Sequence, residues 1–233
     1  MPNPLATLVL GPVLLMQGRR VRREVPRLPE PPGARAGVAG AGPRLRLLVL
    51  GDSAAAGVGA GHQDQALSGQ LVRALSPRFE VHWRLEAKTG ATTASTIEHL
   101  RSLPSAPFDV AVSSLGVNDV TAGRRVSHWL HEQAALRALL RERFGVGRLL
   151  VSGLPPVHAF PALPQPLRWY LGARARAFDQ ALRQSLAREP GVRHVGFDGG
   201  HDVASMMASD GFHPGPPVYA AWAERLAGAL DAD

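Results

Sequence analysis

The stretch Leu-Arg-Leu-Leu-Val-Leu-Gly-Asp-Ser, residues 45–53, decides the fold. Five of its first six residues are apolar, and the run stops at Gly51. Short runs of this kind are typical of strands that are buried on both faces of a parallel sheet. Ligands of open α/β sheets bind beyond the carboxyl ends of such strands. Residues 45–53 therefore predict a buried strand whose carboxyl end presents Asp52 and Ser53.

The same pattern recurs along the chain. Further apolar runs predict strands at 79–85, 109–114, 148–152 and 192–197. The segments between them predict helices at 68–75, 94–103, 127–144, 168–188 and 217–230. Strands that alternate with helices in this way favour a parallel sheet with helices on both faces. The sequence thus predicts an α/β fold.

Composition limits the classes of protein that the chain can belong to. With 233 residues, 45% of them hydrophobic, it can bury the core of one large domain. The absence of cysteine excludes disulfides, zinc–thiolate sites, iron–sulfur clusters and a cysteine nucleophile. Residues 1–48 hold eight arginines and two acids, which is +6 of the total charge of +7. Because a nucleic-acid enzyme usually carries its basic patch on the folded body, no nucleic-acid partner is expected.

The N-terminal leader combines an apolar run, residues 5–16, with arginines at positions 19, 20, 22 and 23. Twelve residues span roughly 18 Å as a helix, which is less than the ~30 Å hydrocarbon core of a bilayer. A secretory signal would carry its positive charges before the apolar run. Three interpretations stay open: residues 5–23 lie on a membrane surface, they form a helix that packs on the domain, or they are a targeting signal.

Residues 25–43 contain five prolines and are predicted to be a linker. The expected division of the chain is therefore a leader and linker over 1–43 and a folded domain over 44–233. The expected location is cytoplasmic or peripheral to a membrane, with export left open.

Candidate functional residues follow several of the predicted strands. They are Ser53 after the first strand, Gly90 after the second, Asn118 after the third, and Asp210 with His213 near the C-terminus. A serine hydroxyl is a nucleophile, an Asp–His pair activates it, and glycine N–H and asparagine amide groups stabilise an oxyanion. Each of these motifs, taken alone, is more readily explained by a turn or a helix cap.

Other motifs are weaker or absent. The glycine-rich stretch 57–61 fails the dinucleotide fingerprint because His62 occupies the place of the last required glycine. Neither a phosphate-binding Gly-Lys-Ser/Thr motif nor a Gly-x-Ser-x-Gly elbow is present. His128 and His131 share a helix face, but no third ligand lies nearby in the sequence, so a metal pair is not expected.

The combination of blocks resembles the SGNH (GDSL) hydrolase family of esterases and lipases. The blocks are GDSAAAG at 51–57, the glycine at 90, GVND at 116–119 and DGFHP at 210–214, and the resemblance covers most of 45–230. It implies a three-layer α/β/α, flavodoxin-like parallel sheet of about five strands. It also implies that no metal or cofactor takes part.

The resemblance assigns roles to individual residues. Ser53 is expected to be the nucleophile, His213 the general base and then acid, and Asp210 the carboxylate that orients the imidazole. The expected oxyanion donors are the N–H groups of Ser53 and Gly90 and the side chain of Asn118. The implied reaction is ester cleavage through an acyl-enzyme.

The substrate is expected to be a small-molecule or lipid ester. The stretch 154–170 contains five prolines together with Phe160 and Trp169, and with Phe212 it is a candidate acyl pocket, although core packing explains it equally well. The expected activity is that of an esterase or a lysophospholipase-like enzyme. A carbohydrate O-deacetylase or an acyltransferase on the same fold is the alternative, and a membrane-tethered binding module without catalysis is a further one.

Overall fold

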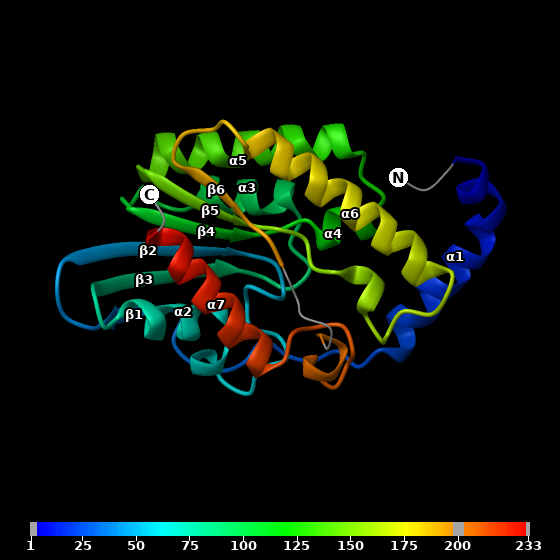
Figure 1. Ribbon diagram of the computed structural model, residues 1–233, viewed down its shortest axis with the longest axis horizontal. Helices are drawn as coiled ribbons and strands as arrows, with labels where there is room; N and C mark the ends of the chain where they lie inside the picture. Colours follow the sequence, from blue (N-terminus) through cyan, green and yellow to red (C-terminus); the bar gives the residue numbers. More distant parts are fainter. Residues whose placement is uncertain (1–3, 198–202, 232–233) are drawn as a thin grey trace.

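The computed structural model describes residues 4–197 and 203–231. A six-stranded sheet runs through the centre in the order β1-β3-β2-β4-β5-β6 (Figure 1). Its strands are β1 (Ala36–Ala39), β2 (Arg44–Gly51), β3 (Glu80–Ala87), β4 (Val110–Ser114), β5 (Arg148–Ser152) and β6 (Val192–Val195). β2 to β6 pair in parallel, and β1 alone is antiparallel. The predicted five-stranded parallel sheet is confirmed, with one added edge strand.

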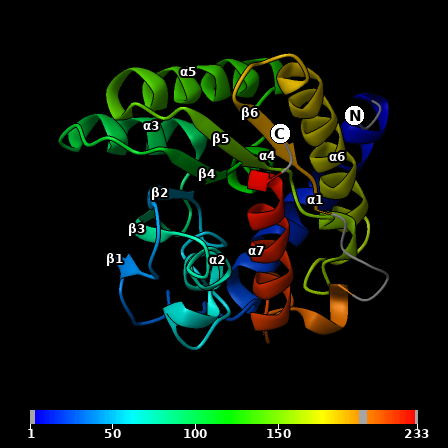
Figure 2. The same ribbon diagram turned by 60° about the vertical axis from the view of Figure 1, so that its left-hand side comes forward.

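Helices cover both faces of the sheet, which makes three layers (Figures 1 and 2). The helices are α1 (Pro4–Glu24), α2 (Leu67–Leu75), α3 (Thr93–Ser102), α4 (Val117–Thr121), α5 (Val126–Phe144), α6 (Leu167–Leu186) and α7 (Pro216–Asp231). α3, α5 and α6 pack on one face, and α2 and α7 pack on the other. α1 lies outside the sheet layers, against α6.

The central strand β2 is apolar along its length because both of its faces are buried. Leu48 and Leu50 belong to the core under α3, α5 and α6, whereas Leu47 and Val49 belong to the core under α2 and α7. All four side chains are at most 1% exposed. Side chains alternate between the two faces of a strand, so a continuous apolar run is what a doubly covered strand requires. This burial fixes the position of Ser53 just beyond the end of the strand.

The segment before β2 differs from the predicted linker. Residues 36–39 form β1, which continues the sheet beyond β3 with Ala36 opposite Arg84 and Ala39 opposite Val81. Just before it, the N–H of Leu85 donates to the carbonyl of Arg35 at 2.7 Å. An unpaired edge of β3 would expose a row of backbone donors and acceptors, and β1 satisfies them. A four-residue strand between glycines and prolines carries too little pattern to be recognised in the sequence.

The leader forms one 21-residue helix, α1, which packs on the body along one side. Leu14 is buried there, and the Gln17 side chain accepts from the N–H of Leu167 at 3.0 Å and donates to the carbonyl of Gln165 at 2.7 Å. Among the residues that the structure describes, no helix is both long enough and apolar enough to cross a membrane.

Candidate active site

The predicted serine, histidine and aspartate meet at the carboxyl edge of the sheet. Ser53 follows β2, while Asp210 and His213 lie in the loop before α7. The Ser53 Oγ atom is 2.9 Å from His213 Nε2, and His213 Nδ1 is 2.5 Å from Asp210 Oδ2. With Nδ1 donating to the carboxylate, Nε2 is free to accept the serine proton. The fold thus joins two groups that are 160 positions apart in the chain.

Asp210 is held ionised by its hydrogen bonds. The side chain is 1% exposed, and its Oδ1 atom accepts from the N–H groups of Phe212 at 2.9 Å and His213 at 3.0 Å. Burial acts to raise the pKa of this carboxyl, but the hydrogen bonds from the His213 ring and from the two backbone N–H groups outweigh burial and lower the pKa. An ionised Asp210 orients the imidazole and stabilises its cation.

Backbone hydrogen bonds order the loop that carries Asp210 and His213. Ala208 N donates to the carbonyl of His213 at 2.9 Å, and Gly215 N donates to the carbonyl of Met206 at 3.0 Å. α7, which follows the loop, is anchored by the buried hydroxyl of Tyr219, which donates to the Val58 carbonyl at 2.7 Å. The imidazole is therefore placed by local loop geometry and by the docking of α7.

The three predicted oxyanion donors lie around the serine, but not in one pocket. Among the described residues the N–H of Ser53 has no partner. The Asn118 amide donates to the Ala91 carbonyl at 2.9 Å, and the same nitrogen is 3.4 Å from Asp52 Oδ2. Ser53 and Asn118 line the same pocket as His213, whereas Gly90 lines the neighbouring cavity. The Asn118–Ala91 hydrogen bond connects this site to the turn over residues 88–91, which we call the Gly90 turn.

Position 90 favours glycine because of its backbone conformation, and not because a side chain would lack room. Its φ is +81°, a region that side-chain-bearing residues rarely adopt. A Cβ atom placed there would meet nothing within 4 Å. In the described part of the chain its N–H has no hydrogen-bond partner, so it is available to a ligand.

Asp52 is a site residue that the sequence reasoning did not single out. Its side chain is 4% exposed, and Oδ1 accepts from the N–H of Ala54 at 3.1 Å. Burial raises the pKa of Asp52 to about 7, against the hydrogen bond from Ala54 and the nearby His213. The only sequence signal was its position before Ser53, where aspartate also serves as an ordinary cap.

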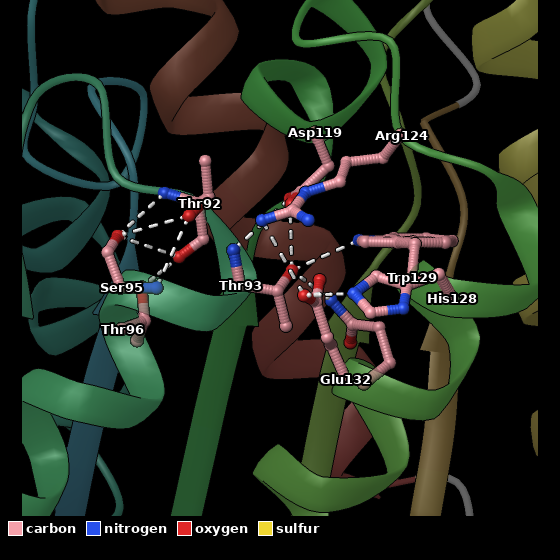
Figure 3. Close-up of polar contacts among 10 residues, drawn as sticks. Thr92, Thr93, Ser95, Thr96, Asp119, Arg124, His128, Trp129 and Glu132 are labelled. Carbon is pink, nitrogen blue, oxygen red and sulfur yellow. Dashed lines mark hydrogen bonds and ion pairs between the residues drawn. The ribbon is translucent and has the colours of Figure 1, made fainter.

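A buried polar network around Asp119, the residue after Asn118, joins three helices (Figure 3). Asp119 Oδ2 accepts from the backbone N–H of Thr93 at 3.2 Å and from its hydroxyl at 3.0 Å. The Thr93 Oγ1 atom also accepts from Trp129 Nε1 and Gln133 Nε2, each at 3.0 Å. Burial is the main cause that raises the pKa of Asp119. The network fixes α4, which carries Asn118, against α3, whose N-terminus follows the Gly90 turn.

His128 of α5 is explained by an ordinary contact. His128 Nε2 lies 3.0 Å from Glu132 Oε1, which is also 3.8 Å from Arg124 Nη2 (Figure 3). Within the described ranges no group of three or more histidine, aspartate or glutamate side chains is placed to hold a metal.

The pocket at Ser53 is small and mostly apolar. Phe160 and Phe212 line it, as predicted, and their rings meet edge to face with centroids 5.2 Å apart. Leu115, Leu154 and Trp222 complete much of its wall. Its volume is about 60 Å³.

Trp169, the third residue predicted for this pocket, does not line it. It lies near the start of α6 and is 42% exposed. The proline-rich stretch 154–170 turns Phe160 inward, whereas the helical twist of α6 leaves Trp169 facing out.

The fold and the geometry define the class: an α/β protein with a hydrogen-bonded Ser53–His213–Asp210 arrangement at the carboxyl edge of its sheet. The chain belongs to the GDSL-like lipase/acylhydrolase family, whose profile matches residues 49–221. The match begins within β2, so it leaves out α1 and β1.

Known proteins resemble the chain in sequence and in fold. A GDSL-like esterase of Mycobacterium tuberculosis is 28% identical over 201 residues, which cover 80% of this chain and 62% of that protein. The chain thus spans less than two thirds of the length of this relative. A lipase from a goat rumen metagenome has a TM-score of 0.64 at 20% identity, covering 79% of this chain and 97% of its own. A carbohydrate acetylesterase from Sinorhizobium meliloti has a TM-score of 0.60 at 16% identity, covering 81% and 99%. These two structures share the fold.

Proposed function

We propose that the chain is a serine esterase that hydrolyses carboxylic esters with short acyl groups through an acyl-enzyme. The observation that carries this proposal is the continuous series of hydrogen bonds from Ser53 Oγ through the His213 ring to the buried Asp210. The series ends beside an apolar pocket, at the edge of the sheet where ligands of this fold class bind. Membership of a family of esterases and lipases supports the same reaction.

Acylation follows from the geometry. Ser53 Oγ attacks the carbonyl carbon of the ester while His213 Nε2 takes its proton, and Asp210 stabilises the imidazolium that forms. The N–H of Ser53, the N–H of Gly90 and the amide of Asn118 are the donors for the tetrahedral oxyanion. The C–O bond to the alcohol then breaks, and His213 gives the proton to the departing alkoxide.

Deacylation repeats the same steps with water. His213 removes a proton from a water molecule, whose oxygen attacks the acyl carbon of the Ser53 ester. The second tetrahedral intermediate collapses with cleavage of the bond to Ser53 Oγ, which regains its proton from His213. The products are the carboxylic acid and the free enzyme.

The pocket volume favours short acyl groups. A cavity of about 60 Å³ encloses only a short acyl segment. The aromatic rings of Phe160 and Phe212 line it. This volume disfavours a long-chain lysophospholipid as substrate. It supports a carbohydrate O-deacetylase as the second candidate, because an acetyl group fits and a protein of the same fold is a carbohydrate acetylesterase.

A fluorophosphonate probe tests the nucleophile. The wild type should be labelled, and Ser53→Ala should not. Ser114→Ala is the matched control because Ser114 lines the same pocket, and it should be labelled like the wild type. Absence of labelling in the folded wild type, or labelling that survives Ser53→Ala, contradicts the proposal.

A panel of p-nitrophenyl esters tests the acyl preference. The acetate and butyrate should be cleaved at least about tenfold faster than the octanoate and palmitate, since the longer chains exceed the pocket. Equal or faster cleavage of the palmitate would rule out this pocket as the acyl site. Faster release of acetate from an acetylated oligosaccharide than from the aryl ester would favour the second candidate.

A further inference from the structure

The outer surface of α1 is apolar over its first half and basic over its second. Leu8, Val9, Leu15 and Met16 are 64% to 77% exposed. At 3.6 residues per turn they share one side of the helix with Arg19, Arg20, Arg22 and Arg23. The opposite side packs on the body through Leu10, Leu14 and Val21. We call the exposed side, residues 8–23, the α1 outer face.

This face stands out from the rest of the surface. The large hydrophobic side chains that are exposed in the described part of the chain number eight, and five of them are on α1. Of the four arginines only Arg20 has an acidic partner, Glu24 at 2.7 Å, among the described residues. Three guanidinium groups, those of Arg19, Arg22 and Arg23, therefore lie uncompensated beside exposed apolar side chains, and together with Leu15 and Met16 they line a shallow groove.

We propose that the α1 outer face docks on the surface of an anionic lipid bilayer. The apolar half would enter the boundary between headgroups and acyl chains, and the arginines would pair with lipid phosphates. A soluble acidic partner would not use the apolar half, and a second copy of the chain would meet the same positive charge. The placement of α1 at the edge of the molecule leaves this face open (Figures 1 and 2).

The inward side of α1 adjoins the wall of the proposed catalytic pocket. Phe212 lines that pocket on one side and a cavity between α1 and α6 on the other. The membrane proposal rests on the surface of α1 alone, so it does not depend on the proposed ester hydrolysis.

Vesicle flotation of the full chain tests the docking. Vesicles of phosphatidylcholine with phosphatidylglycerol should bind the protein, and pure phosphatidylcholine should bind it at least tenfold more weakly. Binding should weaken with salt, because the charges are exposed. A variant with Arg19, Arg20, Arg22 and Arg23 all changed to Gln should lose at least about tenfold in affinity. A variant with Leu8, Val9, Leu15 and Met16 all changed to Ser should lose a similar amount.

A matched control variant loses four positive charges at other places on the surface. Arg73, Arg101 and Arg183 are exposed on other helices and Arg188 is exposed just after α6, and changing all four to Gln should leave binding close to that of the wild type. Thermal melts verify that each variant is folded.

Failure of the wild type to bind anionic vesicles, or equal losses in the control, would overturn the proposal. A loss restricted to the arginine variant would overturn it in favour of simple phosphate binding. Dimers that disappear with the serine variant would overturn it in favour of self-association.

A second inference comes from the segment before β1, which holds the Gly90 turn. Glu30 Oε1 accepts from the N–H of Thr89 at 2.7 Å and from its hydroxyl at 2.8 Å. Glu30 Oε2 pairs with Arg35 Nη1 at 2.9 Å, and Arg35 Nη2 donates to the carbonyl of Ala87. Glu30 and Arg35 therefore hold the turn on both sides of Lys88. We call this set of contacts the Glu30 clamp.

The clamp forms in a partly buried place. Burial acts to raise the pKa of Glu30, but the hydrogen bonds from Thr89 and the charge of Arg35 outweigh it and lower the pKa. The carboxylate is thus kept in the charged form that accepts both Thr89 hydrogen bonds. Glu30 lies outside residues 49–221, the part that the family profile matches.

We infer that Glu30 is a positioning residue that sets the direction of the Gly90 N–H as an oxyanion donor. This inference rests on the proposed function. A Cβ atom at Gly90 would meet nothing within 4 Å, so no close packing at that side of the residue fixes its orientation. Two side chains hold its neighbours: Glu30 accepts from the N–H of Thr89, and Asn118 donates to the carbonyl of Ala91.

Steady-state kinetics of the full chain on p-nitrophenyl acetate test the clamp. Glu30→Ala should lower kcat about 10- to 100-fold with little change in KM, because a misplaced donor affects the oxyanion more than the bound ester. Glu30→Gln keeps an oxygen acceptor for Thr89 and should recover part of kcat. Glu98→Gln removes an exposed acid from α3 and should match the wild type.

The possible results distinguish a failure of the Glu30 inference from a failure of the proposed function. If the wild type neither turns over ester nor is labelled by fluorophosphonate, the proposed function fails and the clamp fails with it. If the wild type is active and folded Glu30→Ala keeps its kcat, only the clamp fails. A rise in KM at constant kcat would also overturn the clamp, since it would assign Glu30 to substrate binding.

Discussion

Two buried aspartates in this site differ in the number of hydrogen bonds that they accept. Asp210 accepts from the His213 ring and from two backbone N–H groups, and its pKa is lowered. Asp52 is more deeply enclosed by protein and accepts one good hydrogen bond, from Ala54, and its pKa is raised to about 7. Burial favours the neutral acid and hydrogen-bond donors favour the carboxylate, so deeper burial together with fewer donors raises the pKa of Asp52, whereas the donors prevail at Asp210. The charged one is the partner of the histidine.

Asp210→Asn should lower kcat by about 10³–10⁴ while leaving the protein folded. The asparagine can donate to Nδ1, and the imidazole would then carry its proton on Nε2, where it cannot accept from Ser53. Hydrolysis of p-nitrophenyl acetate at saturating substrate measures the effect, and a thermal melt verifies the fold. Retention of more than a tenth of the wild-type kcat would show that Asp210 does not orient His213.

Asp52→Asn should change how stability depends on pH. The ordinary pKa of 3.8 applies in the unfolded chain, whereas the pKa is about 7 in the fold. Between these values the folded state binds more protons, so the ionisable Asp52 makes the free energy of unfolding fall as pH rises from about 4 to 7. The variant lacks this contribution.

Urea unfolding of the wild type and of Asp52→Asn at a series of pH values measures the difference. The wild type should lose stability relative to the variant as pH rises through this window. Parallel curves for the two proteins would contradict the raised pKa.

At the scale of elements, Thr93 connects three helices. It begins α3, donates to Asp119 of α4, and accepts from Trp129 and Gln133 of α5 (Figure 3). Asn118 precedes Asp119 directly, so the network positions this proposed oxyanion donor through helix packing and not through contact with substrate.

Thr93→Val should destabilise the protein by about 2–4 kcal/mol, because it keeps the shape of the side chain and leaves the buried donors of Trp129 and Gln133 unpaired. Denaturant unfolding measures it. Thr121→Val is the control, since Thr121 is exposed, and it should change stability by less than about 0.5 kcal/mol. Equal effects of the two substitutions would mean that the buried network adds no stability.

At the scale of the whole molecule, the N-terminal segment has two separate roles. Residues 4–24 form α1 on the outside, whereas residues 25–43 supply the Glu30 clamp and β1. The carbonyl of Pro32 also accepts from the N–H of Gln63 at 2.9 Å. The second part is therefore integrated into the domain, although its composition suggested a linker.

Two truncations distinguish these roles. The 25–233 fragment should keep its kcat on a soluble ester and most of its thermal stability. The 44–233 fragment should melt at least about 5 °C lower and turn over at least tenfold more slowly, because the edge of β3 and the Gly90 turn lose their partners. Indistinguishable fragments would show that 25–43 is a linker after all.

The sequence by itself determined the strands of 44–233, its longer helices, and the order of the blocks that carry Ser53, Asn118, Asp210 and His213. It did not predict α4, the five-residue helix Val117–Thr121. Burial on both faces makes a parallel strand apolar, and an amphipathic helix repeats its pattern every few residues, so these features are local and readable.

The tertiary structure alone decided which side chains meet. It turned Phe160 and Phe212 into the pocket and left Trp169 outside, and it added β1 to the sheet. It also placed Glu30 against Thr89, 59 positions away. Contacts between distant residues leave no local pattern, because they depend on how the layers pack.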